Sequence, residues 1–130
     1  MQIGVLATNV GVNTQTIRYY ERVGLLPEPE RSDAGYRLYG VEDERRLEFI
    51  KNARNVGLTL GEVKEVLAFH ERGEPPCAFV TRTIARRSEE IERQISELTE
   101  FKNELDRLYE RACREPAQEP EDGSYCHIIN

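Results

Sequence analysis

The sequence lacks any long apolar run: no stretch approaches the roughly 18 consecutive apolar residues that a membrane-spanning helix needs. Its N-terminus, MQIGVLATNV, also lacks the basic start and apolar block of a secretory signal peptide. We therefore expect a cytoplasmic protein with no membrane partner. No residues pair a nucleophile with a base in a pattern typical of catalysis, so we expect no enzyme.

Cysteine is scarce, and the three that are present, Cys77, Cys113 and Cys126, form an odd number. An odd count in a chain with no export signal argues against a disulfide framework and favours free thiols or metal thiolates. The alternative for each cysteine is a small buried hydrophobic residue or an inert thiol.

An excess of positive charge is also missing, because the formal net charge is -6. Its distribution matters more than its sum. Residues 1–40 hold four basic and four acidic residues, a balance of 0, whereas residues 73–130 hold eight basic and thirteen acidic ones, a balance of -5. The acidity therefore lies in the C-terminal half, and a small basic face near the N-terminus remains possible.

Two short helices are predicted at the N-terminus. Apolar residues in 3–10 follow the i, i+3, i+4, i+7 spacing of one helical face, and Gly11 ends that helix. Asn13 or Thr14 can cap a second helix, which Gly24 stops. Two short helices joined by a tight glycine turn are typical of a helix-turn-helix, whose second helix enters a DNA groove.

The next segments predict a wing and two more helices. Residues 26–39 read as a two-stranded wing, because its prolines forbid a helix and Ser-Asp-Ala-Gly makes a polar turn. Residues 42–55 are helical, and Thr59 with Glu62 forms a capping box that opens another helix.

Glycine and proline are both absent from 77 to 112, while Ile84, Ile91, Leu98, Leu105 and Ala112 recur every seven residues. A helix over this range is about 54 Å long at 1.5 Å per residue, far longer than a small head can cover. We therefore expect a coiled coil with a second copy, and so a homodimer. The alternative is that this helix folds back on its own head.

The residues that favour nucleic-acid binding lie in the second helix and the wing. Arg18 and Arg22 are four residues apart and share a helical face, and Tyr19 lies beside them, whereas Tyr20 is expected in the core. Arginine is the side chain best matched to phosphate oxygens and guanine edges. The full set of candidate DNA-contacting residues is Thr16, Arg18, Tyr19, Arg22, Arg31, Tyr36, Arg37 and Tyr39.

Three segments carry a resemblance to a known family: TIRYYERxGLLP, then RSDAGYRLY, then LxFIKNARxxGLTLGEV. In this order they resemble the MerR family of bacterial transcription regulators over the first 70 residues. The resemblance implies a mainly α fold with a winged helix-turn-helix head at 1–72, an antiparallel dimerisation helix at 73–112, and a metal-binding loop and tail at 113–130. It also implies double-stranded promoter DNA as partner, and RNA polymerase acting on the same promoter, which the regulator distorts on binding its effector.

The same resemblance indicates the effector. In an antiparallel pair, Cys77 of one chain could meet Cys113 and Cys126 of its partner, and three thiolates suit a soft, thiophilic cation. A cysteine at the start of the dimer helix is similar to the divalent-metal branch, which points to Hg²⁺, Cd²⁺, Pb²⁺ or Zn²⁺. The loop between Cys113 and Cys126 is longer than is typical of this branch, and position 114 holds Arg where zinc sensors often have a second Cys. Both differences favour a site of three thiolates over a pair of zinc ions.

Several alternatives stay open. His127 could serve as a fourth ligand, or it could be a solvent-facing or hydrogen-bonded histidine. The chain could be a regulator of an organic ligand with incidental cysteines, a metal-sequestering or redox thiol protein that keeps the head, or a coiled-coil adaptor. The sequence names neither the metal, nor the number of ions per dimer, nor the operator.

Overall fold

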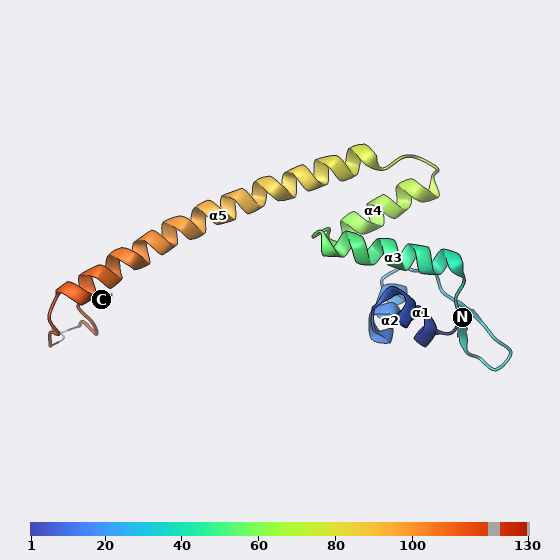
Figure 1. The fold of residues 1–130 in the computed structure, drawn as a ribbon, viewed down its shortest axis with the longest axis horizontal. Helices are drawn as coiled ribbons and strands as arrows, with labels where there is room; N and C mark the ends of the chain where they lie inside the picture. The colour runs from blue at the N-terminus through green and yellow to red at the C-terminus, as the bar shows by residue number, and fades with distance from the viewer. Residues whose placement is uncertain (120–122, 130) are drawn as a thin grey trace. The chain divides into compact units, whose positions relative to one another are not determined.

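The computed structural model describes residues 1–119 and 123–129. These residues form five helices (Figure 1), and two short strands pair in one sheet. The predicted mainly α class is confirmed. The chain divides into two compact units, Met1–Ile84 and Ala85–Asn130. Among the described residues, no helix is both long and apolar enough to cross a membrane. Pro120 and Asn130, which belong to the predicted tail loop, lie outside the described residues.

The helix-turn-helix is confirmed as α1 (Ile3–Val10) and α2 (Thr14–Arg22). Gly11 ends α1 in the left-handed region at φ +81°, where a side chain would be strained. Asn13 then caps α2, because its side-chain oxygen accepts a hydrogen bond from the Thr16 backbone N–H at 2.7 Å. Because of the tight turn and the cap, only three residues separate the end of α1 from the start of α2.

The wing consists of β1 (Glu30–Arg31) and β2 (Arg37–Leu38), which pair antiparallel with Arg31 opposite Arg37. Gly35 closes the turn between them, with φ at +87° and its N–H bonded to the Ser32 carbonyl at 2.9 Å. The wing is therefore present as predicted, although each strand is only two residues long.

Two further helices complete the head, α3 (Val41–Asn55) and α4 (Leu60–Glu71). The predicted capping box at the start of α4 is present: Thr59 N–H donates to the Glu62 carboxylate at 2.8 Å, and Glu62 N–H donates to the Thr59 hydroxyl at 3.1 Å. Apolar side chains from α1, α2, α3, α4 and the loop after α2 form one core, whose fully buried members are Leu6, Ile17, Leu25, Leu47, Ile50 and Val63.

The long helix α5 (Cys77–Arg114) is two residues longer than predicted, and its first turns belong to the head. The Phe79 ring lies 5.8 Å from the Phe69 ring, Val80 packs on the core, and Thr83 is 3% exposed. The first compact unit thus extends to Ile84, whereas the sequence placed the end of the head at residue 72.

In the second unit, the apolar stripe of α5 faces solvent. Ile91 is 46% exposed, Leu98 66%, Phe101 56% and Leu105 48%. The tail after α5 is irregular, as expected, but Tyr125 and Ile129 are 94% and 80% exposed. Within the described residues of the single chain, these two side chains therefore do not pack on an apolar surface.

Candidate nucleic-acid interface and thiol sites

The outer face of α2 carries Arg18, Tyr19 and Arg22, all of them exposed. They point outward because Ile17 and Tyr20, three residues apart, take the buried face. The Arg22 guanidinium lies 5.7 Å from the centre of the Tyr19 ring, a cation–π contact that limits the freedom of both side chains. Basic groups are thus displayed on the second helix of the helix-turn-helix.

A hollow of about 390 Å³ lies between α2 and the wing. Four arginines contribute to its walls, two from each element, and two glutamates and a proline complete it: Arg18, Arg22, Arg31, Arg37, Glu21, Glu28 and Pro29. Four positive and two negative charges leave a formal balance of +2 in a protein whose total is -6. The hollow therefore carries the charge that attracts a phosphate.

The wing residues near the hollow differ in how exposed their side chains are and in how many of their hydrogen-bond donors are already used. The Arg31 guanidinium donates to the Gly35 carbonyl at 2.8 Å, so part of its donor capacity holds the turn together. Tyr36, beside that turn, is 61% exposed. Arg37 is half-buried, and its Nε lies 3.4 Å from the Glu21 carboxylate. Arg31 and Tyr36 are thus the more accessible wing candidates.

Tyr39 does not lie on this surface, which corrects the sequence prediction. Its side chain is 4% exposed, and its hydroxyl donates a short hydrogen bond to the Glu21 carboxylate. Burial and then this hydrogen bond raise the pKa of Tyr39 well above its usual range. Tyr39 therefore fixes the wing to α2 from the inside and is not available to contact DNA.

Glu21 holds the site together, a role that the candidate residues predicted from the sequence did not include. Its carboxylate, with the side chain 10% exposed, receives the Tyr39 hydroxyl and faces the Arg37 guanidinium. The available signal in the sequence was the single carboxylate between the two arginines of the RYYER run, because a charge that becomes buried requires partners. Glu21 joins α2 to the second strand of the wing.

Thr16 has a local role. Its backbone N–H and its hydroxyl both donate to the Asn13 side-chain oxygen, at 2.7 and 2.9 Å. A hydroxyl has one hydrogen to donate. In this arrangement Thr16 completes the cap of α2 and has no remaining donor for a phosphate.

The three cysteines are free and exposed. Cys77 is the first residue of α5, Cys113 lies in its last turn, and Cys126 lies in the tail. Over 1–119 and 123–129 of one chain, no three His, Cys, Asp or Glu side chains are grouped so that they could hold a metal ion. The predicted thiol set therefore does not come together within a single chain.

Cys126 is the thiol with an identifiable electrostatic environment. Backbone hydrogen bonds from Ile129 and then Ile128 lower its pKa, and the positive charge of Arg111 acts in the same direction. The thiolate is the form of cysteine that binds metals, so this turn favours the ligand form.

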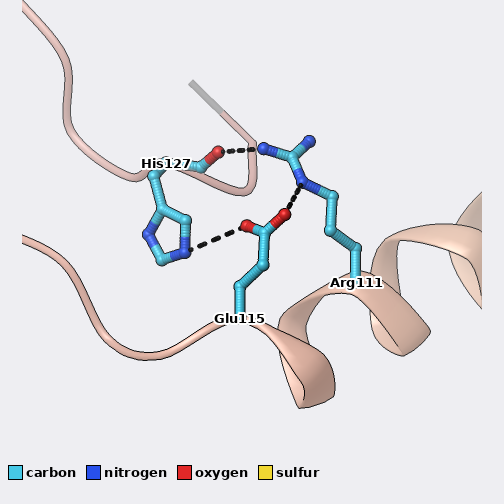
Figure 2. A network of polar contacts seen from close by, with 3 residues as sticks. All are labelled: Arg111, Glu115 and His127. Carbon is cyan, nitrogen blue, oxygen red and sulfur yellow. Dashed lines mark hydrogen bonds and ion pairs between the residues drawn. The ribbon is translucent and has the colours of Figure 1, made fainter.

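His127 is held in a polar network at the end of α5 (Figure 2). Its Nε2 lies 3.5 Å from the Glu115 carboxylate. Arg111 binds both neighbours, donating to Glu115 at 3.0 Å and to the His127 backbone carbonyl at 2.8 Å. Of the two alternatives for His127, the single chain shows the one in which the imidazole faces a protein partner.

Comparison with known proteins agrees with this arrangement. A family model described as "MerR HTH family regulatory protein" matches residues 1–69, and one described as "MerR, DNA binding" matches residues 44–108. The mercuric resistance operon regulatory protein of Bacillus cereus is 43% identical over 110 residues, covering 85% of this chain and 83% of that protein. The transcriptional regulator ZntR of Escherichia coli K12 is 34% identical over 113 residues, covering 86% and 80%.

Among solved structures, PbrR691 of Ralstonia metallidurans in complex with lead(II) is similar over nearly the whole chain. The TM-score is 0.77 and the identity 31%, with 99% of this chain and 96% of that one covered. The fold, the arginine-lined hollow and these matches lead to one conclusion: the chain belongs to the MerR family of helix-turn-helix regulatory proteins.

Proposed function

We propose that this protein is a homodimeric transcriptional regulator that binds promoter DNA and responds to a thiophilic divalent cation: Hg²⁺, Cd²⁺, Pb²⁺ or Zn²⁺. The cation binds at Cys77, Cys113 and Cys126, and on binding it the regulator distorts the promoter DNA, so that RNA polymerase transcribes metal-resistance genes. Each part of the proposal rests on a different region of the chain.

DNA binding is supported by the hollow between α2 and the wing. Its four arginines come from two elements that are separate in the sequence, and a formal balance of +2 gathers there in an acidic protein. Arginine contacts with phosphates position a protein on DNA, and side chains of the second helix read base edges. Arg18, Tyr19, Arg22, Arg31 and Tyr36 are the exposed residues proposed for these contacts.

Dimerisation is supported by the exposed stripe on α5. A 38-residue helix is about 57 Å long, and in the single chain its apolar side chains Ile91, Leu98 and Leu105 are exposed to solvent. Burial of such a seven-residue repeat against a second copy is the usual way to stabilise a helix of this length. In an antiparallel pair, the Cys77 end of one helix lies against the Cys113 end of the other.

The metal response is carried by one observation: a relative of matching length, similar over 99% of this chain, was solved in complex with lead(II). Relatives named for mercuric resistance are consistent with it. The donor chemistry of this chain fits such ions, since three free thiols are available and the pKa of Cys126 is lowered. Soft thiolate ligands select soft cations and reject Mg²⁺ and Ca²⁺.

The test is titration of the reduced full-length protein with one cation at a time, following the ultraviolet absorbance of the metal–thiolate bonds. Cys113→Ser should abolish metal binding and the metal-induced transcript while leaving DNA affinity unchanged. Ser88→Ala, on the exposed part of α5, is the matched control and should behave as wild type. An unchanged metal-induced transcript in Cys113→Ser would refute the proposed metal response through Cys113 and would favour the alternative, a regulator of an organic ligand.

A second measurement separates regulation from metal storage. A nuclease footprint on the DNA upstream of the protein's own gene should be centred between two promoter elements. A protein that only sequesters metal would leave no such footprint, and a coiled-coil adaptor would dimerise without any salt-dependent affinity for DNA.

A further inference from the structure

The tail that carries Cys126 is tied back to the end of α5. Cys126 follows Cys113 by 13 residues (126 − 113), and the tail between them has no regular secondary structure among its described residues. A free segment of this length samples many positions, and bringing its end to a fixed ligand costs conformational entropy. The residue after Cys126 is nevertheless attached to the last turns of the helix (Figure 2).

Arg111 makes this attachment. Its Nε donates to Glu115 Oε1 at 3.0 Å, and its Nη2 donates to the His127 backbone carbonyl at 2.8 Å. Glu115 directly follows the last residue of α5, with its backbone N–H bonded to the Arg111 carbonyl at 2.9 Å, and its second carboxylate oxygen lies 3.5 Å from His127 Nε2. One guanidinium thus contacts the helix and the tail at once, on the residue next to a proposed metal ligand.

We infer that Arg111 is a positioning residue of the metal site, which holds the Cys126 segment at the end of α5 before the cation arrives. This inference rests on the proposed function, because it assumes that Cys126 is a metal ligand. The planar fork of arginine suits the role, since two of its N–H groups point to two different acceptors in a fixed geometry. Lysine would keep the charge but not the fork.

The positive charge of Arg111 acts in the same direction, because it compensates part of the negative charge of a site built from three thiolates. Residues that orient metal ligands from outside typically change metal affinity by about 10-fold to 100-fold when they are replaced.

The experiment titrates the reduced, full-length dimer with Pb²⁺ alone, in competition with a chromophoric chelator. Arg111→Ala should weaken Pb²⁺ binding by about 10-fold to 100-fold and lower the lead–thiolate absorbance per bound ion, because Cys126 is less often engaged. Arg111→Lys should resemble the alanine variant. Arg107→Ala, which removes the same charge one turn earlier on α5, should bind Pb²⁺ as the wild type does.

The outcomes separate this inference from the proposed function. Metal-free DNA affinity equal to that of wild type shows that each variant is a folded dimer. If Arg111→Ala binds Pb²⁺ unchanged while Cys113→Ser does not bind, the positioning role is overturned and the metal site stands. Full recovery in Arg111→Lys also overturns it, because charge alone would then suffice. If Cys113→Ser also binds unchanged, the proposed metal site itself is wrong.

Discussion

The contact between Tyr39 and Glu21 gives the most specific prediction about the head. Tyr39→Phe keeps the aromatic ring in the core and removes one hydroxyl, leaving the Glu21 carboxylate, with its side chain 10% exposed, to face Arg37 alone. A hydrogen bond to a charged acceptor contributes about 1.5–3 kcal/mol. We therefore expect the free energy of unfolding to fall by about 2 kcal/mol.

Denaturant unfolding followed by circular dichroism measures this change, at one fixed protomer concentration because the protein is expected to dimerise. Tyr36→Phe is the control: Tyr36 is 61% exposed, and the loss of its hydroxyl should change the free energy of unfolding by less than about 0.5 kcal/mol. The double variant Glu21→Gln with Tyr39→Phe should lose less than the sum of the two single variants, because both remove the same contact.

The pH dependence follows from the same contact. Burial and the Glu21 hydrogen bond raise the pKa of Tyr39 in the folded state, while in the unfolded chain it stays near its ordinary value of about 10. Above that pH the unfolded state binds fewer protons than the folded state. This stabilisation is therefore fully present below about pH 10 and is lost as the pH rises further. Tyr39→Phe should flatten that decline, and an equally steep decline together with an unchanged free energy of unfolding would refute the reasoning.

Two further predictions concern the surfaces. Arg18→Ala and Arg22→Ala should each reduce the slope of log DNA affinity against log salt concentration by about 2 per dimer, because each head loses one phosphate contact. Fluorescence anisotropy at several salt concentrations measures this slope. An unchanged slope would exclude phosphate contact by that arginine. Leu98→Asp should weaken dimerisation by at least about tenfold in analytical ultracentrifugation, because it places a charge in the apolar seven-residue repeat of α5 that the dimer buries. Ser96→Asp, on the opposite side of the helix, should leave dimerisation unchanged. A stable Leu98→Asp dimer would exclude this repeat as the dimer contact.

The elements of the head could be predicted from the sequence because their determinants are local. The Asn13 cap and the Thr59 capping box act within four residues, and the apolar spacing of Leu47 and Ile50 identifies a helical face. Such signals do not depend on which other segment lies nearby. The exposure of Arg18 and Arg22 on α2 follows from the same local spacing.

The roles of Tyr39 and Glu21 could not be predicted in this way. Tyr39 follows a two-residue strand, which is too short for an alternating pattern to show which side chain faces inward. Its partner Glu21 is 18 residues earlier, so the contact exists only once the wing has folded onto α2. The fork of Arg111 similarly joins residues 16 apart across an irregular tail.

The packing of the first turns of α5 on the head limits how such regulators can be recombined. Pro75 and Pro76 look like a natural junction between a reader of DNA and a sensor, yet Phe79, Val80 and Thr83 beyond them complete the core of the head. A chimaera joined at the prolines would replace these side chains by those of another protein and so disturb the packing of the core. A junction after Ile84 keeps the native packing, so that exchange of sensors between relatives should succeed there.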